Sequence, residues 1–336
     1  TKRYEVIENE LVEIKEKYAD ERRTRIIKMA TEFNPEDMYA DDDMVITISH
    51  LGYIKRTPLA DFRQQGRGGV GAKASAARDE DFIEYVHQAN MHSTMMFFTE
   101  QGRLYWTKVY ELPEGNRQSK GRALQNMINI QKGDKVCAFI HVKNLNDMEY
   151  VQNHYLIFAT KDGLMKKTTL ESYSRPRANG IIALGLREGD RLIRVTLTDG
   201  NSQMLVASYN GKVVRFPEDT VRPMGRTATG VRAIKLDEDG QDRVIGMICV
   251  EEGSKESVLV ISEKGFGKRT DLDDENGEPI YRITNRGGKG VKTMNLTDKT
   301  GNLIGLEAVT DEQDLMLITK SGTAIRMAMD TIRVMG

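Results

Sequence analysis

The amino-acid sequence predicts an all-β fold, a propeller-like ring of six four-stranded blades, preceded by a short α-helical segment. Three observations support this prediction. A pattern of about fifty residues recurs six times, each copy begins with a β-hairpin signature, and only the first 31 residues follow a helical pattern. Six such units favour a closed ring over an open solenoid, because radial closure removes most exposed strand edges.

Residues 1–31 are expected to form the helical segment. Apolar residues recur there at steps of four, three and four, at Ile7, Leu11, Ile14 and Tyr18. This spacing is typical of a coiled-coil seam, although about two heptads are too few to hold a coiled coil alone. The segment is therefore either an amphipathic surface helix or the end of a longer coiled-coil arm. The chain starts without an initiator Met, so we expect it to be part of a longer protein.

Residues 32–42 read as a solvated linker, and the ring is predicted to span residues 43–336. Pro35 interrupts the helical pattern, and Asp41 opens a run of three aspartates. Proline cannot continue a helix interior, and a run of like charges favours solvent over a core. We therefore place a domain boundary near residue 42.

Each predicted hairpin is marked by a glycine and by a Ser or Thr three positions before it. The hydroxyl bonds back to the backbone and opens the turn, and the glycine takes the positive φ that lets the second strand return. Apolar residues alternate along the first strand, as expected of a half-buried strand. The six turn glycines are Gly52, Gly102, Gly163, Gly211, Gly265 and Gly322.

A second glycine follows five of the six hairpins, and short β-type runs follow most of these glycines. Each repeat is therefore expected to supply about four strands. The corresponding glycine of the sixth repeat would fall beyond Gly336, so we expect the last repeat to be truncated. The second glycines are Gly71, Gly121, Gly180, Gly230 and Gly290.

Basic residues occupy fixed positions in the repeat. Four residues after the turn glycine, five of six copies carry Lys or Arg, and the sixth carries Trp106, which we expect to be a packed aromatic. Four residues before the second glycine, four of five copies carry Arg. Equivalent positions in a ring lie at equivalent places, so these cations are predicted to form a belt on the rim that binds DNA phosphates. Bending DNA through a half-turn over about 40 base pairs costs on the order of 10 kcal/mol, so many contacts must act together. The candidate DNA-binding residues from this pattern are Lys55, Arg56, Lys73, Arg117, Lys120, Lys166, Lys167, Arg175, Arg177, Arg215, Arg226, Lys268, Arg269, Arg286, Lys289 and Arg326.

A glycine-rich loop at residues 66–71 adds further candidates. It fits the dinucleotide-binding fingerprint, but no helix follows at once and no βαβ unit surrounds it, which argues against a nucleotide cofactor. Glycines without a Cβ let backbone N–H groups approach phosphates closely. The DNA-binding candidates from this loop are Gln65, Arg67, Gly68, Gly69 and Gly71.

Composition excludes several other classes of protein. The formal net charge is −1, from 49 basic and 50 acidic residues. Binding to a polyanion therefore depends on where the positive charges lie on the surface. Cys137 and Cys249 cannot form a disulfide framework or a zinc site, and the five histidines show no metal-ligand spacing. No apolar run approaches the roughly 18 residues needed to cross a bilayer, and a cytoplasmic location is expected.

The hairpin pattern, the stretch 52–56 and the heptapeptide 65–71 resemble the C-terminal domain of the DNA gyrase A subunit. The heptapeptide stands where that family carries its gyrase A box, although Gly66 and Val70 replace basic residues. Residues 285–290 are closer to the box in charge. The resemblance implies a six-bladed β-pinwheel whose blades exchange strands, with residues 1–31 as the end of the coiled-coil arm.

The resemblance also implies a function. It implies a domain that wraps DNA so that the holoenzyme of two A and two B subunits introduces negative supercoils with ATP, in the bacterial cytoplasm with the nucleoid. The expected partners are double-stranded DNA, the gyrase B subunit and the catalytic domain of the A subunit. ATP and Mg²⁺ would act on other domains or subunits, and this chain is expected to hold no cofactor or metal, to lack the catalytic tyrosine and to be inactive alone. The alternatives are the A-type subunit of topoisomerase IV, which decatenates or relaxes DNA, and a protein-binding β-propeller of the WD or kelch type.

Overall fold

The computed structural model describes residues 2–21, 23–24, 34–61, 81, 83–116, 119–238, 240–251, 253–318 and 324–335. The chain divides into two compact units, Thr1–Tyr39 and Ala40–Gly336, and each is described by itself. In the described part of the chain, no helix is both long and apolar enough to span a bilayer.

The first unit contains helix α1 (Lys2–Tyr18) and the 3₁₀-helix η1 (Pro35–Met38). Glu5 lies in the first turn of α1 and two lysines in its last turn, which complements the helix dipole. No residue of α1 is buried, and Ile7 and Leu11 are 45% and 60% exposed. The helix therefore presents its apolar stripe to solvent within this unit.

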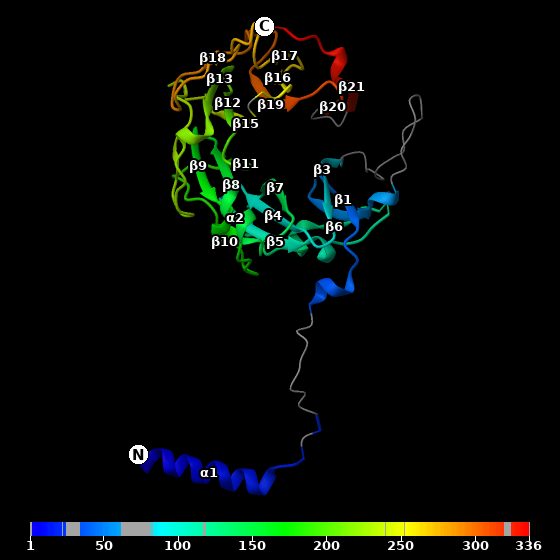
Figure 1. The fold of residues 1–336 in the computed structure, drawn as a ribbon, viewed down its shortest axis with the longest axis vertical. Helices are drawn as coiled ribbons and strands as arrows, with labels where there is room; N and C mark the ends of the chain where they lie inside the picture. The colour runs from blue at the N-terminus through cyan, green and yellow to red at the C-terminus, as the bar shows by residue number, and fades with distance from the viewer. Residues whose placement is uncertain are drawn as a thin grey trace. The chain divides into compact units, whose positions relative to one another are not determined.

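The second unit is all-β apart from helix α2 (Met148–Asn153) and short 3₁₀-helices. Its sheets are arranged round a common centre (Figure 1). The strands are β1 (Asp43–Ser49), β2 (Tyr53–Pro58), β3 (Ile83–Asn90), β4 (Thr94–Thr99), β5 (Arg103–Lys108), β6 (Arg122–Ala123), β7 (Val136–Val142), β8 (Tyr155–Thr160), β9 (Leu164–Thr169), β10 (Ile181–Ile182), β11 (Leu192–Thr198), β12 (Gln203–Ser208), β13 (Lys212–Pro217), β14 (Val231–Arg232), β15 (Val244–Val250), β16 (Ser257–Ser262), β17 (Gly267–Asp271), β18 (Val291–Lys292), β19 (Leu303–Val309), β20 (Asp314–Ile318) and β21 (Ala324–Ala328).

Each complete blade is built from a hairpin, a long inner strand and a short outer strand, all paired antiparallel. The complete blades have the strand orders β3-β1-β2-β6, β7-β4-β5-β10, β11-β8-β9-β14 and β15-β12-β13-β18. In each of them the short outer strand comes from the following repeat; β6, for example, lies in the second repeat and pairs with β2 of the first. The blades therefore exchange strands, as the resemblance implied.

The predicted count of six four-stranded blades is wrong for the described residues, which form five blades. The fifth blade has three strands (β19-β16-β17), and the sixth repeat contributes only the hairpin β20-β21. Strand exchange explains why the fifth blade lacks a fourth strand. The outer strand of each blade follows the second glycine of the next repeat, and the sixth repeat has no such glycine in this sequence.

The turn geometry agrees with the prediction. Gly52, Gly102 and Gly163 have φ of 79°, 74° and 85°. The hydroxyl of Ser49 accepts a hydrogen bond from the backbone N–H of Tyr53 at 3.1 Å. A left-handed conformation at this point is strained for any residue with a Cβ, which is why glycine recurs there.

The second glycines are required for a different reason, the close approach of two backbones. At Gly121 a Cβ would lie 2.3 Å from the carbonyl oxygen of Ile54, and at Gly230 it would lie 2.4 Å from that of Met165. These glycines therefore let the chain approach the return strand of the preceding repeat closely, where the short outer strand pairs with it.

The apolar core lies between neighbouring blades. Phe98 of β4 packs edge-to-face on Phe158 of β8, with ring centroids 5.6 Å apart. All six residues of β4 are buried, and β12 and β16 are nearly so. The expectation of half-buried strands is therefore wrong for these first hairpin strands, because a blade covers each of their faces.

A buried or half-buried aspartate holds four of the hairpin turns, and the sequence analysis missed this feature. Asp134 and Asp190, which stand just before inner strands, accept hydrogen bonds from the backbone N–H groups of Gln101 and Asp162 at 3.1 and 3.0 Å. Asp81 and Asp242 do the same in their repeats. The sequence signal that could have revealed this feature is an aspartate two residues before the inner strand, which recurs in four repeats.

Candidate nucleic-acid interface

The cations four residues after the turn glycine are buried between blades. Arg56, Lys167, Arg215 and Arg269 are each 4–6% exposed. The prediction that they line an exposed belt is therefore wrong. The return strand of each hairpin is covered by the next blade, so this position faces protein and not solvent.

Each of these buried cations pairs with a carboxylate beyond its own repeat. The nitrogen–oxygen distances are 3.0 Å for Arg56–Glu114, 2.7 Å for Lys167–Glu218, 3.1 Å for Arg215–Asp273 and 2.5 Å for Arg269–Asp311. The three arginines also donate to backbone carbonyls of the next repeat, at Tyr110, Leu272 and Met329. These pairs therefore join consecutive repeats, and we call them the inter-repeat ion pairs.

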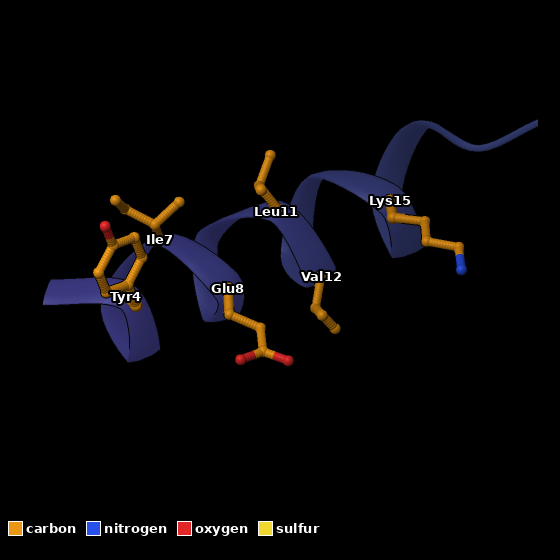
Figure 2. A pocket seen from close by; sticks show the side chains of 6 residues that line it. All are labelled: Tyr4, Ile7, Glu8, Leu11, Val12 and Lys15. Carbon is orange, nitrogen blue, oxygen red and sulfur yellow. The ribbon is translucent and has the colours of Figure 1, made fainter. Parts of the chain in front are cut away.

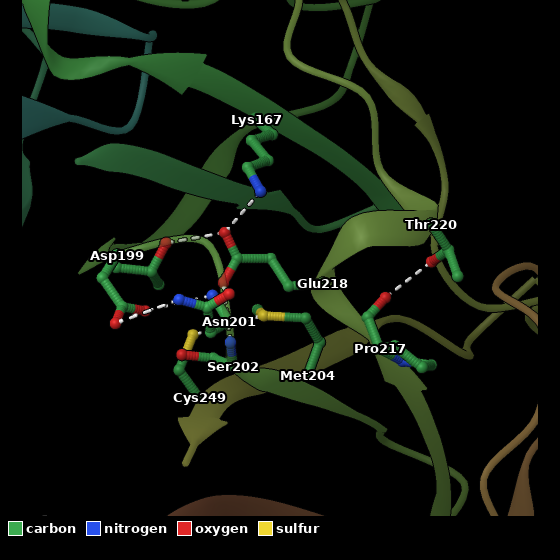
Figure 3. A network of polar contacts seen from close by, with 10 residues as sticks. Lys167, Asp199, Asn201, Ser202, Met204, Pro217, Glu218, Thr220 and Cys249 are labelled. Atoms are coloured by element: carbon green, nitrogen blue, oxygen red, sulfur yellow. Dashed lines mark hydrogen bonds and ion pairs between the residues drawn. The ribbon is translucent and has the colours of Figure 1, made fainter. Parts of the chain in front are cut away.

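The inter-repeat ion pair of Lys167 is the most deeply buried of the four (Figure 3). The Glu218 side chain has no exposed surface, and it also accepts hydrogen bonds from the Thr198 hydroxyl at 2.7 Å and the Ser202 backbone N–H at 3.2 Å. The Lys167 ammonium lies over the ring of Tyr155, 4.2 Å from its centroid. Both charges are therefore compensated within the protein.

The second repeat carries Trp106 at this position. Its ring is partly buried and packs against the apolar cluster between the second and third blades. The expectation of a packed aromatic is confirmed.

The lysines one position earlier are buried too. Lys166 has no exposed surface, Lys55 is 3% exposed and Lys268 is half-buried. The Lys166 ammonium donates to the hydroxyl of Tyr173 at 3.1 Å and to the carbonyls of Ala183 and Arg226. Burial, with a smaller contribution from the nearby Arg226 charge, lowers the pKa of Lys166 to about 7. The predicted exposure is wrong for Lys55 and Lys166.

The exposed candidates lie in the loops between the hairpin and the short outer strand, which we call the rim loops. Among the described residues, none of these cations has a carboxylate within ion-pair distance. The Lys120 ammonium lies 3.7 Å from the centroid of the Tyr53 ring. Arg226 is half-buried, and the exposed ones are Lys120, Arg175, Arg177, Arg286 and Lys289.

Further exposed cations lie on this side of the blades, beyond the candidate residues given above. Arg232 and Lys292 are the second residues after their glycines and end the short outer strands β14 and β18. Arg122, in β6, is exposed as well. Lys73 holds the equivalent position in the first repeat, so the periodic signal was present in the sequence.

Some candidates cannot be placed. Arg326 is described only by its backbone, which pairs with Met316 in the hairpin β20-β21. The candidates that lie outside the described residues are Gln65, Arg67, Gly68, Gly69, Gly71, Lys73 and Arg117.

Backbone hydrogen bonds tie two of the rim loops to the preceding repeat. The N–H of Gly185, just after β10, donates to Ala228 in the rim loop of the fourth repeat at 3.2 Å. The N–H of Lys235, just after β14, donates to Gly288 in the rim loop of the fifth repeat at 2.8 Å. These two rim loops are therefore each held against the segment that follows the short outer strand of the repeat before.

These features define a propeller-like ring of strand-exchanging blades, with rim-loop cations that have no carboxylate partner in the described part of the chain. The sequence profile described as DNA gyrase C-terminal domain, beta-propeller, matches residues 43–90, 93–143, 154–199, 203–251, 256–310 and 313–336. The chain belongs to this family.

Curated relatives agree with this assignment. The chain is 41% identical over 329 residues to the DNA gyrase A subunit of Staphylococcus epidermidis (strain ATCC 12228 / FDA PCI 1200), which covers 98% of the chain and 36% of the relative. It is 40% identical over 324 residues to the DNA gyrase A subunit of Staphylococcus aureus (strain NCTC 8325 / PS 47), covering 96% and 35%. The chain thus spans about a third of the length of these relatives.

Two solved structures share the fold. The C-terminal domain of DNA topoisomerase IV superposes with a TM-score of 0.71 at 26% identity, covering 88% of this chain and 86% of that one. The DNA gyrase A C-terminal domain superposes with a TM-score of 0.66 at 22% identity, covering 88% and 92%.

Proposed function

We propose that this chain is the DNA-wrapping C-terminal part of a gyrase A subunit and that its rim loops bind the backbone of duplex DNA. The observation that carries the proposal is the set of exposed cations without carboxylate partners, among the described residues, on rim loops that recur from repeat to repeat. Phosphate contacts of this kind release counterions and need no base readout.

The inter-repeat ion pairs explain how a chain of net charge −1 can present a cationic rim. They pair four carboxylates with four buried cations, so neither sign contributes much to the outer field. Asp134, Asp190 and Asp242 are turned towards backbone N–H groups of the hairpin turns. The cations of the rim loops are therefore left to face a polyanion.

We propose that β20-β21 is the hairpin of a sixth, incomplete unit of the ring. Two observations support this placement. Met316 pairs with Arg326 in the same register in which Ile46 pairs with Arg56 in the first hairpin. The bridge between Arg269 and Val334 is equivalent to the bridge between Arg215 and Ile283 one repeat earlier.

For α1 we propose the end of a coiled-coil arm, which leads through the segment 32–42 to the ring. Figure 2 shows Tyr4, Ile7 and Leu11 along the helix. With Glu8, Val12 and Lys15 they line a shallow groove on α1. A second helix with apolar residues at matching spacing would cover this stripe.

The remaining expectations belong to the same proposal. The chain would act with the catalytic part of the A subunit and with the B subunit, in an assembly of two A and two B subunits that uses ATP and Mg²⁺ outside this chain. It would work in the bacterial cytoplasm with the nucleoid. The names of the curated relatives support the gyrase A part of this proposal.

The A-type subunit of topoisomerase IV is the second candidate. The likeness to the C-terminal domain of topoisomerase IV, at a TM-score of 0.71, favours it. The two candidates differ in whether the chain wraps DNA with a writhe of fixed sign.

Two measurements test the proposal on the 336-residue chain. The affinity for a duplex of about 40 base pairs is measured between about 50 and 300 mM salt; six rim-loop cations predict a slope of log K against log salt of about −5 or steeper. A nicked circle is then ligated with the chain bound, and wrapping as in gyrase predicts a raised linking number. An unchanged linking number would support topoisomerase IV. Absent or salt-insensitive binding would contradict DNA binding and support a protein-binding propeller.

A further inference from the structure

Two rim loops rest on a buried lysine of the preceding repeat. The loop at residues 222–230 of the fourth repeat covers Lys166 of β9, and residues 114–116 and 119–121 of the second repeat cover Lys55 of β2. Among the described residues no carboxylate pairs with Lys166, and the DNA contacts proposed above use neither lysine. Each directs its ammonium to backbone carbonyls of the loop.

The loop of the fourth repeat is held at three points. Its entry donates from the N–H of Met224 to the carbonyl of Lys167 at 2.8 Å. Its middle is bonded through the Arg226 carbonyl to the Lys166 ammonium. Its end, Gly230, lies so close to Met165 that a Cβ would approach the carbonyl oxygen to 2.4 Å. Of these three contacts, only the one from Lys166 is made by a side chain.

The loop of the second repeat has the same construction. The N–H of Gly115 donates to the Arg56 carbonyl at 3.0 Å. The Lys55 ammonium donates to the carbonyls of Asn116 and Ser119 at 3.1 and 2.8 Å. Gly121 closes the loop against Ile54, as Gly230 does against Met165.

The loop of the fifth repeat shows what replaces the lysine. It covers Val214, which has no donor, and there the loop's own Arg286 donates to the backbone carbonyls of Thr220 at 3.1 Å and Arg232 at 3.4 Å. The guanidinium of Arg286 is therefore engaged in hydrogen bonds to the backbone of the preceding repeat. Where a lysine lies beneath the loop, Arg226 and Lys120 make no such contact to carbonyls among the described residues.

We propose that Lys55 and Lys166 are positioning residues for phosphate binding. Each binds backbone carbonyls of the rim loop above it and holds them towards the protein interior, so that the cations of that loop face solvent. This inference rests on the proposed function, since it assumes that the rim loops contact DNA. A buried donor with several carbonyl partners is costly to replace, because its removal leaves those carbonyls unpaired.

The test uses the 336-residue chain with Lys166→Met and Lys55→Met, and with Lys132→Met as a matched control that removes an exposed lysine. Amide hydrogen exchange is followed in residues 222–230 and 119–122. Lys166→Met should raise exchange about tenfold in the first segment and leave the second unchanged, because only the loop above the lysine loses its support. Lys55→Met should do the reverse, and Lys132→Met should do neither.

DNA binding supplies the second readout. Each positioning variant should lower the magnitude of the salt slope by about 1 and weaken binding about tenfold at about 0.1 M salt, as expected when one phosphate contact is lost. Arg222 is an exposed cation of the loop above Lys166, and we take it as a phosphate contact of that loop. Arg222→Ala should weaken binding less in the Lys166→Met background than in the wild type, whereas its effect in the Lys55→Met background should be unchanged. This coupling separates positioning from general loss of stability.

The outcomes distinguish the two proposals. Uniform exchange changes across the ring, or an unchanged salt slope in both variants, would overturn the positioning role while the proposed function stands. A wild-type chain without salt-dependent DNA binding would overturn the proposed function, and the exchange pattern would still decide whether the lysines hold the loops. If Lys166→Met does not fold, Lys55→Met carries the same test at its own loop.

Discussion

Removing the carboxylate of Glu218 should destabilise the ring without weakening DNA binding. In Glu218→Gln the Lys167 ammonium keeps its burial, with 5% of its side chain exposed, but loses the charge that lies 2.7 Å away. Breaking a buried ion pair from one side costs about 3–5 kcal/mol, because an uncompensated charge remains inside. The free energy of unfolding should fall by that amount.

The assay is denaturant unfolding of the chain, together with thermal melting. At about 2 °C per kcal/mol for a domain of this size, the midpoint should fall by about 6–10 °C. The double variant Lys167→Met/Glu218→Gln removes both charges and should recover most of the loss, since a neutral pair of similar volume carries no desolvation cost.

The measured DNA affinity decides between two roles for Lys167. If it belongs to an inter-repeat ion pair, the folded double variant binds duplex DNA as the wild type does, with the same salt slope. If Lys167 is a DNA contact, the double variant keeps its stability but binds more weakly, with a slope reduced by about 1. That second result, or a stable Glu218→Gln, would refute the structural role.

Three further predictions follow from single positions. Arg232→Ala should reduce the salt slope of DNA binding by about 1 at unchanged stability, and an unchanged slope would remove this residue from the interface. The pKa of about 7 for Lys166 lies below the ordinary 10.5 of an unfolded lysine, so between these values the folded chain binds fewer protons than the unfolded one. The free energy of unfolding should therefore rise with pH across that interval, by up to about 1.4 kcal/mol per pH unit, and this rise should vanish in Lys166→Met. Gly121→Ala should cost about 1–3 kcal/mol, because φ is 84° and the new Cβ would meet a backbone carbonyl, whereas Gly52→Ala, with open space around it, should cost less in a paired denaturation experiment.

The sequence predicted those parts of the fold that depend on local geometry. A hydroxyl residue and a glycine three positions apart specify a hairpin turn by their own backbone and side-chain bonding, and the turn at Ser49 and Gly52 formed as expected. The second glycines were found in the same way, although their reason, the crossing of a strand from the next repeat, appeared only in the structure. The three-stranded fifth blade was not predicted, because strand exchange moves the outer strand of one blade into the following repeat.

The sequence also established that cations recur at fixed positions of the repeat, but it did not establish which way they face. Arg215 and Arg286 are both periodic arginines; one is buried against Asp273 and the other is exposed on a rim loop. Only the tertiary structure decided this, because stacking covers both faces of the hairpin strands. A charged position that would reach solvent on an isolated sheet is then enclosed by the neighbouring blade.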